Sequence, residues 1–208
     1  SIAQRRISNS AFDALHRAGA TILDTRSPQE FAKSHIPESI NIGLDGDFAI
    51  WTGTLYPFGT TFLLITEQGR ERETVSRLAR IGYDNMNGIL EGGIVSWINS
   101  GLATSSIQCT TPKEAEALLA SGEFELLDVR RPGEVESRKL RGAKQIPLGQ
   151  FPRELSHLDP SKKYIVCCAG GYRSMIACSL MKSFDIQHVI NLDGGAARLV
   201  KEKSAIIG

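Results

Sequence analysis

Two stretches of this sequence, ILDTRSPQEF (residues 22–31) and LLDVRRPGEV (residues 126–135), match one another position by position. Each begins with an apolar run and continues with aspartate, arginine, proline and glutamate in the same order, at an offset of 104. A second pair, GILEGG (residues 88–93) and INLDGG (residues 190–195), has an offset of 102. Because self-similarity at a fixed spacing indicates a duplicated unit, we predict two copies of one fold. The first copy then carries two extra residues, which we expect between about residues 42 and 62.

Each copy alternates helical and strand patterns. The first opens with a helix that Ser10 is expected to cap and that ends near Gly19, and the second with a helix that begins at Thr111 and Pro112 and stops at Gly122. Proline at the first helical position and glycine just past the end are typical of helix boundaries. Short apolar runs follow, namely ILDT, FLLIT and GIL in the first copy and LLDV, YIVCC and VINL in the second. Such runs between helical patterns favour a buried parallel sheet covered by helices.

The duplication therefore predicts two α/β domains, residues 1–103 and 104–208, each of about the usual domain size. The stretch GLATSSIQCT (residues 101–110) lies between the copies and is predicted to be the linker.

The composition excludes several functional classes. The chain has 24 basic and 23 acidic residues, so its charge indicates neither a nucleic-acid partner nor a basic membrane-binding face. Its apolar runs are too short to span a bilayer. The start, SIAQRRISNS, has neither a methionine nor an apolar leader, so we expect no signal peptide and a chain that is processed or part of a longer protein.

The cysteines and histidines indicate no metal site. The spacing of the four cysteines fits neither a disulfide framework nor a zinc site, and a reducing cytoplasm is the expected compartment. The four histidines fall in no metal-binding pattern.

The stretch CCAGGYRS (residues 167–174) joins a predicted strand of the second copy to a helical pattern, SMIACSLMKS. This loop lies at the carboxyl end of a parallel strand, where open α/β sheets bind their ligands. Gly170 and Gly171 allow a sharp turn whose N–H groups point inward, and the following helix adds the positive end of its dipole. A cysteine at the start of this loop is therefore expected to be stabilised as a thiolate, with Arg173 as a nearby cation.

Together, D-x-R-x-P-x-E, C-A-G-G-Y-R-S and L-D-G-G resemble the rhodanese, or sulfurtransferase, family, twice over and across nearly the whole chain. The resemblance implies a parallel sheet sandwiched by helices, with Cys168 and Arg173 as catalytic residues and no metal or organic cofactor in this chain. Cys168 would take a sulfane sulfur from thiosulfate or a low-molecular-weight persulfide and pass it to a thiol or cyanide. The remaining residues of the implied active-site loop are Ala169, Gly170, Gly171, Tyr172 and Ser174.

The adjacent cysteines leave two chemistries open. Four residues separate Cys168 from Arg173, as in sulfurtransferases, whereas five separate Cys167 from it, the spacing of cysteine phosphatases. The repeat aligns Cys167 with Ile65, a strand position, so Cys167 is expected to face the apolar interior and Cys168 to be the nucleophile. A phosphatase or arsenate reductase on the same fold is one alternative, and a non-catalytic protein-binding module is the other.

The first copy lacks the thiol. Its equivalent loop is TEQGRE (residues 66–71), with Thr66 in place of the cysteine and Glu71 in place of the arginine. We predict that this domain is non-catalytic and serves as a structural unit or a docking surface. Three aromatic residues of the longer segment are expected to pack over the edge of the core or to form a contact surface: Trp51, Tyr56 and Phe58.

Several further residues are predicted to be structural. Asp24 and Asp128 recur in both copies and are expected to cap the next turn, and the recurring arginine is expected to pair with the recurring glutamate, Glu30 or Glu134. Cys109 and Cys178 are expected to be inert packing residues. A basic segment of the second domain, either a solvated face or a means of attracting anionic donors, comprises Arg131, Arg138, Lys139 and Arg141.

A degenerate copy followed by an active one resembles the C-terminal part of bacterial proteins that fuse a metallo-β-lactamase-fold persulfide dioxygenase to two rhodanese domains. This resemblance implies a role in sulfide metabolism and an iron-bearing domain upstream of this chain. That domain or a second copy of the chain are the expected protein partners.

Overall fold

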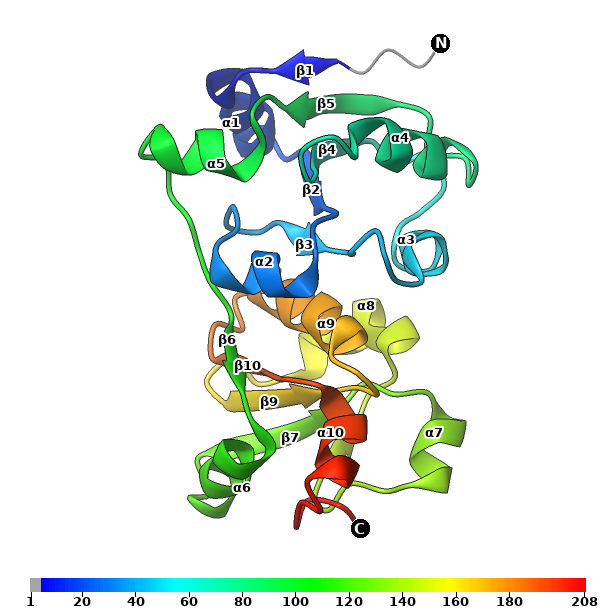
Figure 1. Ribbon diagram of the computed structural model, residues 1–208, viewed down its shortest axis with the longest axis vertical. Helices are drawn as coiled ribbons and strands as arrows, with labels where there is room; N and C mark the ends of the chain where they lie inside the picture. The colour runs from blue at the N-terminus through cyan, green and yellow to red at the C-terminus, as the bar shows by residue number, and fades with distance from the viewer. Residues whose placement is uncertain (1–4) are drawn as a thin grey trace. The chain divides into compact units, whose positions relative to one another are not determined.

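The computed structural model describes residues 5–208, so the expectation for the chain start rests in part on residues 1–4, which lie outside the described residues. The chain forms two compact units. Their boundary in the sequence lies between Ser106 and Ile107, three residues beyond the predicted boundary. Each unit contains a five-stranded parallel sheet flanked by helices (Figure 1), which is the predicted architecture. Among the described residues, no helix is both long and apolar enough to cross a membrane.

The strands of the first unit follow the order β1-β5-β4-β2-β3. They are β1 (Arg6–Ile7), β2 (Thr21–Asp24), β3 (Ile40–Asn41), β4 (Phe62–Ile65) and β5 (Met86–Leu90). The helices are α1 (Asn9–Arg17), α2 (Pro28–Lys33), α3 (Phe48–Leu55), α4 (Glu71–Ala79) and α5 (Gly93–Asn99).

The second unit repeats this order as β6-β10-β9-β7-β8. Its strands are β6 (Gln108–Thr110), β7 (Phe124–Asp128), β8 (Lys144–Gln145), β9 (Lys163–Cys167) and β10 (Val189–Leu192). Its helices are α6 (Pro112–Ala120), α7 (Pro132–Ser137), α8 (Phe151–Glu154), α9 (Tyr172–Ser183) and α10 (Gly195–Lys201), with short 3₁₀ turns η1 (Leu148–Gln150) and η2 (Leu155–His157) on either side of α8.

The two sheets share one register, which locates the insertion. Asp24 is paired with Ile65 in the first sheet, and Asp128 is paired with Cys167 in the second. The offset is therefore 104 at β2 and β3 but 102 from β4 onward. The two extra residues lie between β3 and β4, as the repeat predicts, where α3 replaces the η1–α8–η2 segment of the second unit.

Helix capping agrees with the sequence in one copy and differs in the other. Thr111 caps α6 in a capping box, with its hydroxyl accepting from the Glu114 N–H and the Glu114 carboxylate accepting from the Thr111 N–H. The cap of α1 is Ser8 and not Ser10, since the Ser8 hydroxyl accepts from the Ala11 N–H. The prediction for Ser10 was wrong by two residues because three polar residues precede the apolar positions of this helix.

The predicted linker is only partly a linker. Residues 108–110 form β6, which adds to the edge of the second sheet beside β10, and Cys109 on this strand is exposed. The expectation that Cys109 is a packing residue was therefore wrong. A three-residue edge strand has too short an apolar pattern to distinguish it from a linker.

Apolar side chains fill the space between each sheet and its helices. On one face of the second sheet, residues of β9 and β10 pack against α6 and α10, whereas α9 covers the opposite face (Figure 1). Because side chains alternate along a strand, Ile165 and Cys167 lie on the same face as α6 and α10. The strand thus directs Cys167 into the core and leaves the next residue, Cys168, to begin the loop.

Candidate active site

The loop after β9 surrounds the sulfur of Cys168. Gly171 has φ +100°, a conformation open to glycine, and turns the chain into α9. Its N–H donates to Cys168 Sγ at 3.1 Å, and the Ser174 hydroxyl lies 3.4 Å from the same sulfur. The sulfur also lies at the N-terminal end of the 12-residue helix α9, whose dipole favours negative charge there. This arrangement suits a sulfur atom that carries or receives negative charge.

Cys167 has a different environment from its neighbour. It is fully buried in the apolar cluster between the sheet and helices α6 and α10, as predicted. Burial raises the pKa of its thiol well above the ordinary value, and the thiol donates to the Cys168 carbonyl at 3.3 Å. Cys167 is therefore a small core residue, and a nucleophilic loop that starts at Cys167 does not fit this geometry.

The segment that follows the LDGG motif contacts the backbone of the Cys168 loop. The N–H of Ala196 donates to the Cys168 carbonyl at 2.8 Å, and the N–H of Ala197 donates to the Ala169 carbonyl at 3.0 Å. Gly195 has φ +55°, and a Cβ atom there would lie 2.4 Å from the Cys168 carbonyl oxygen. The start of α10 therefore contacts the loop backbone so closely that only glycine fits at this position.

Arg173, at the start of α9, forms an ion pair with Glu134 on α7. Its two terminal nitrogens each donate to one oxygen of Glu134, both at 2.7 Å, in a bidentate arrangement. Glu134 Oε2 also accepts from the Arg131 N–H at 3.0 Å at the start of α7. The Arg173 hydrogen bonds lower the pKa of Glu134 to about 2, so the carboxylate stays ionised. The sequence predicts Arg173 at this loop but does not identify Glu134 as its partner.

The recurring aspartate and arginine have a structural role in both units. Arg130 donates to both oxygens of Asp128 and to the Arg138 carbonyl, and its N–H bonds Asp128 Oδ1, which forms the predicted turn cap. Arg26 makes the same contacts with Asp24 and the carbonyl of Ser34. The predicted arginine–glutamate pairs were wrong, because each arginine reaches back two residues to the buried aspartate, where unpaired charge is costly.

Ala169, Gly170 and Tyr172 complete the predicted loop around Cys168. Ala169 and Tyr172 are partly buried and Gly170 is exposed. The four cationic residues of the predicted basic segment are all exposed: Arg131, Arg138, Lys139 and Arg141.

A family model described as the rhodanese-like domain matches residues 8–100 and, a second time, residues 111–202. The chain belongs to the rhodanese-like domain family. Two curated relatives match parts of it. A chloroplastic rhodanese-like/PpiC domain-containing protein of Arabidopsis thaliana is 40% identical over 77 residues, which cover 35% of this chain and 26% of that protein. A sulfurtransferase of Allochromatium vinosum is 30% identical over 70 residues, which cover 34% of this chain and 65% of that protein.

These matches cover about a quarter and just under two thirds of the relatives' own lengths. Among solved structures, a thiosulfate sulfurtransferase of Pseudomonas aeruginosa is 21% identical, with a TM-score of 0.43, and the match covers 98% of this chain and 43% of that one.

The first rhodanese-like domain contains the same turn without the thiol. Gly69 has φ +86° and corresponds to Gly171, while Thr66 corresponds to Cys168. Glu67 accepts from the Ser27 N–H at 3.3 Å, and Glu71, at the position of Arg173, forms an ion pair with Arg6 at 3.4 Å. This loop therefore lacks the nucleophile of its counterpart, and its own arginine, Arg70, is bonded to Asp45 and Glu73.

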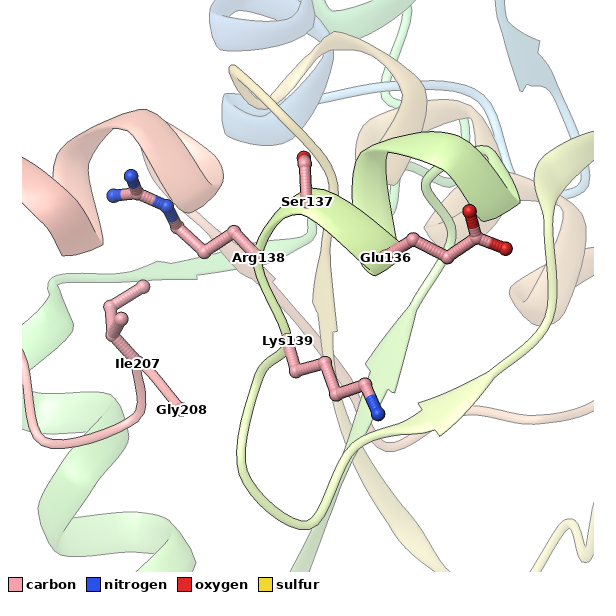
Figure 2. A pocket seen from close by; sticks show the side chains of 6 residues that line it. All are labelled: Glu136, Ser137, Arg138, Lys139, Ile207 and Gly208. Atoms are coloured by element: carbon pink, nitrogen blue, oxygen red, sulfur yellow. The ribbon is translucent and has the colours of Figure 1, made fainter.

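The remaining features of the second rhodanese-like domain lie outside the Cys168 loop. Cys178 is buried on α9, as expected. A hollow of about 550 Å³ lies beside the end of α7 and the last residues of the chain (Figure 2). Its lining residues are Glu136, Ser137, Arg138, Lys139, Ile207 and Gly208, none of which belongs to the loop. Within residues 5–208 no group of three or more His, Cys, Asp or Glu residues is arranged to hold a metal ion.

The aromatic residues of the longer segment divide between core and surface. Trp51 is buried, whereas the Phe58 side chain is 83% exposed. Tyr56 is partly buried and packs edge-on against Phe62. The expectation of packing over the core edge therefore fits Trp51 and Tyr56 but not Phe58.

Proposed function

We propose that this chain is a sulfurtransferase that carries sulfur as a persulfide on Cys168. The thiolate attacks the outer sulfur of a donor, the donor's S–S bond breaks, and its electron pair leaves with the departing anion. An acceptor thiolate or cyanide then attacks the outer sulfur of the persulfide, and the Cys168 thiolate is restored. The two steps balance without an external oxidant or reductant.

The observation that carries this proposal is the environment of the Cys168 sulfur. One backbone N–H at 3.1 Å, the Ser174 hydroxyl at 3.4 Å and the start of α9 surround it, so negative charge on either one or two sulfur atoms is stabilised at that point. Ser174 and Gly171 would hold the sulfur, and Arg173 lies between them in the sequence, paired with Glu134. The rhodanese-like family and its sulfurtransferase members support the same activity.

The geometry favours this activity over a phosphatase or arsenate reductase. The five-residue spacing of a phosphatase loop requires Cys167 as the nucleophile. Cys167 is buried in the core on the face of the sheet that α6 and α10 cover. The arginine that would bind the phosphate oxygens is bonded to Glu134 instead.

We propose that the donor is thiosulfate or a low-molecular-weight persulfide, that the acceptor is a thiol or cyanide, and that the protein acts in the cytoplasm. The first domain serves as a non-catalytic structural or docking unit. In the bacterial fusion context, an upstream persulfide dioxygenase domain that carries iron would supply or consume the persulfide, and a second copy of the chain is the other partner. No metal or organic cofactor acts at Cys168.

A cyanide assay tests the activity. The full chain is incubated with cyanide and either thiosulfate or cysteine persulfide, and thiocyanate is measured. Wild type and Cys167→Ala are expected to form thiocyanate, and Cys168→Ser is expected to form none above background. Thiocyanate formation by Cys168→Ser at the wild-type rate would contradict the proposal, and no turnover by any variant would favour the non-catalytic binding module.

A further inference from the structure

The Glu134–Arg173 pair is fixed in place before any donor arrives. Four atoms take part in two hydrogen bonds of 2.7 Å, and the Arg131 N–H fixes the same carboxylate at the start of α7. The Arg173 side chain is only 14% exposed, so it has little freedom to turn toward solvent. A bidentate guanidinium–carboxylate pair is the strongest common form of a side-chain ion pair, and a donor anion would have to compete with it.

This pair cancels the cationic charge of the loop. Arg173 is the one basic residue in the stretch 168–174. Arg173 lies between Gly171 and Ser174, whose N–H and hydroxyl both contact the Cys168 sulfur, and its hydrogen bonds to Glu134 raise its pKa. The neighbouring Arg130 is bonded to Asp128. With Glu134 in place, the Cys168 thiolate leaves the loop with a net negative charge.

We propose that Glu134 selects the sulfur donor of the Cys168 site, so that a persulfide R–S–SH is accepted in preference to the thiosulfate dianion. This inference rests on the proposed sulfurtransferase activity and names its donor class. Glu134 acts through Arg173 and is thus a positioning residue, because its carboxylate removes the cation that would otherwise attract and hold a dianion.

The two donors differ in charge but not in the bond that is exchanged. With a persulfide, the thiolate attacks the outer sulfur, which keeps its proton, and RS⁻ leaves with the electron pair of the broken S–S bond. With thiosulfate, the same attack brings three negative charges together before sulfite leaves. Because Glu134 already neutralises the cation of the loop, the approach of a persulfide is far more favourable than the approach of the thiosulfate dianion.

The duplication links this pair to the reactive cysteine. In the first domain the equivalent glutamate, Glu30, bonds Lys33 at 2.5 Å on its own helix, and Glu71 stands where Arg173 does. The N–H of Ser27, which corresponds to that of Arg131, is bonded by Glu67 from the loop instead. The domain that contains the thiol is therefore the domain in which the α7 glutamate binds the loop arginine.

Rates of sulfur loading test the inference. Full-length wild type and Glu134→Gln are mixed with thiosulfate or cysteine persulfide, quenched, and analysed by intact mass. We expect wild type to load at least about ten-fold faster from cysteine persulfide than from thiosulfate. Glu134→Gln is expected to raise the thiosulfate rate constant about ten-fold and to change the persulfide rate constant less than about two-fold. Glu136→Gln, an exposed charge on the same helix, is the matched control and should leave the ratio unchanged.

A salt series on the wild type gives a second readout that needs no variant. If the site repels a dianion, thiosulfate loading rises with ionic strength, whereas persulfide loading changes little. Thiosulfate loading that falls with salt, or a donor ratio that is unchanged in Glu134→Gln, would overturn the inference while the sulfurtransferase proposal stands. If wild type takes sulfur from neither donor, both proposals fail.

Discussion

Glu134 and Arg173 join α7 to the start of α9 through two hydrogen bonds between residues that are 39 positions apart. Helix α10 contacts the same loop through N–H bonds to the carbonyls of Cys168 and Ala169. Because the carboxylate is about one third exposed, solvent weakens the attraction, and the pair is expected to stabilise the fold by only about 1 kcal/mol.

This contribution depends on pH in a defined direction. The pKa of Glu134 is lowered to about 2 in the fold from an ordinary value of 4.5, so its stabilising effect is full above 4.5 and is lost as the pH falls toward 2. Glu134→Gln should lower the free energy of unfolding by about 1 kcal/mol at pH 7 and by less at pH 3. Denaturant titrations of both proteins at the two pH values measure this, with Glu136→Gln as control. An equal loss at both pH values would contradict the ion pair as its source.

Cys167 should affect stability and not sulfur transfer. Cys167→Ala removes one buried sulfur atom from the core between β9, α6 and α10, at a cost of about 1 kcal/mol. We expect the loading rate of Cys168 to stay within about two-fold of wild type, since the strand holds the two sulfurs on opposite sides. Urea unfolding and quenched loading on the same samples test both parts. A variant of normal stability that no longer loads sulfur would assign Cys167 to the chemistry.

Residue roles were predictable from the sequence where the repeat constrained them. Aligning Cys167 with the strand residue Ile65 predicted its burial correctly. The partner of Glu134 was missed, because a glutamate that recurs in both copies suggests the same local partner in both. The signal for this partner was the difference between Arg173 in the second copy and Glu71 in the first. A partly buried arginine needs a carboxylate beside it, and the first copy has no arginine at this position.

At the scale of elements, the contact between α10 and the Cys168 loop depends on Gly195. A Cβ atom at Gly195 would lie 2.4 Å from the Cys168 carbonyl oxygen, whereas one at the equivalent Gly93 would lie 3.6 Å from the Thr66 carbonyl oxygen. Both glycines have positive φ, so alanine at either position costs about 1–2 kcal/mol in backbone strain. Only the Gly195 substitution must also move the loop.

Gly195→Ala should therefore slow sulfur loading about 100-fold, since a displacement of the nucleophile by about 1 Å has an effect of this size. Gly93→Ala should lower the melting temperature and leave loading unchanged. Thermal unfolding and quenched loading of the two variants make the comparison. Similar loading rates in both would show that α10 does not position the loop.

Helices and strands with long apolar patterns were predicted correctly, whereas the shortest strands were not. The central strands and the helices α6 and α9 follow from apolar runs, a capping box and glycine turns. Strands β1, β3 and β8 have two residues each, and β6 has three, so their sequences carry too few positions for any periodicity. They form because the neighbouring strand offers an unpaired edge, a tertiary cause that a local pattern does not contain.

At the scale of the molecule, one fold occurs twice and the predicted chemistry occurs once. Both units have the same strand order and the same buried aspartate–arginine pair. They differ in the loop after the central strand, where Thr66, Glu67 and Glu71 replace the groups around Cys168. The duplication itself was predictable from the 104 and 102 offsets, because the shared turns and glycines are requirements of the fold and persist without the activity.

A thiol alone should not restore activity to the first domain. Thr66→Cys places a sulfur at the equivalent position, but Glu71 stands in place of Arg173, so the first loop has no counterpart of the Glu134–Arg173 pair. We expect Thr66→Cys to bind one sulfur atom per chain, like wild type, and Thr66→Cys/Cys168→Ser to bind none. Intact mass after donor treatment gives the count. Two sulfur atoms on Thr66→Cys would mean that the first loop lacks only its cysteine.

The most direct test of sulfur transfer through Cys168 is the number of sulfur atoms that the intact chain takes up and the residue that carries them. The full chain is treated with cysteine persulfide or thiosulfate, desalted, and weighed by mass spectrometry before and after cyanide, with peptide mapping of residues 163–183. We predict a gain of one sulfur atom, located on Cys168, removed by cyanide and absent from Cys168→Ser. A chain that gains no sulfur from either donor, or gains it on Cys109 or Cys167 instead, would contradict this prediction.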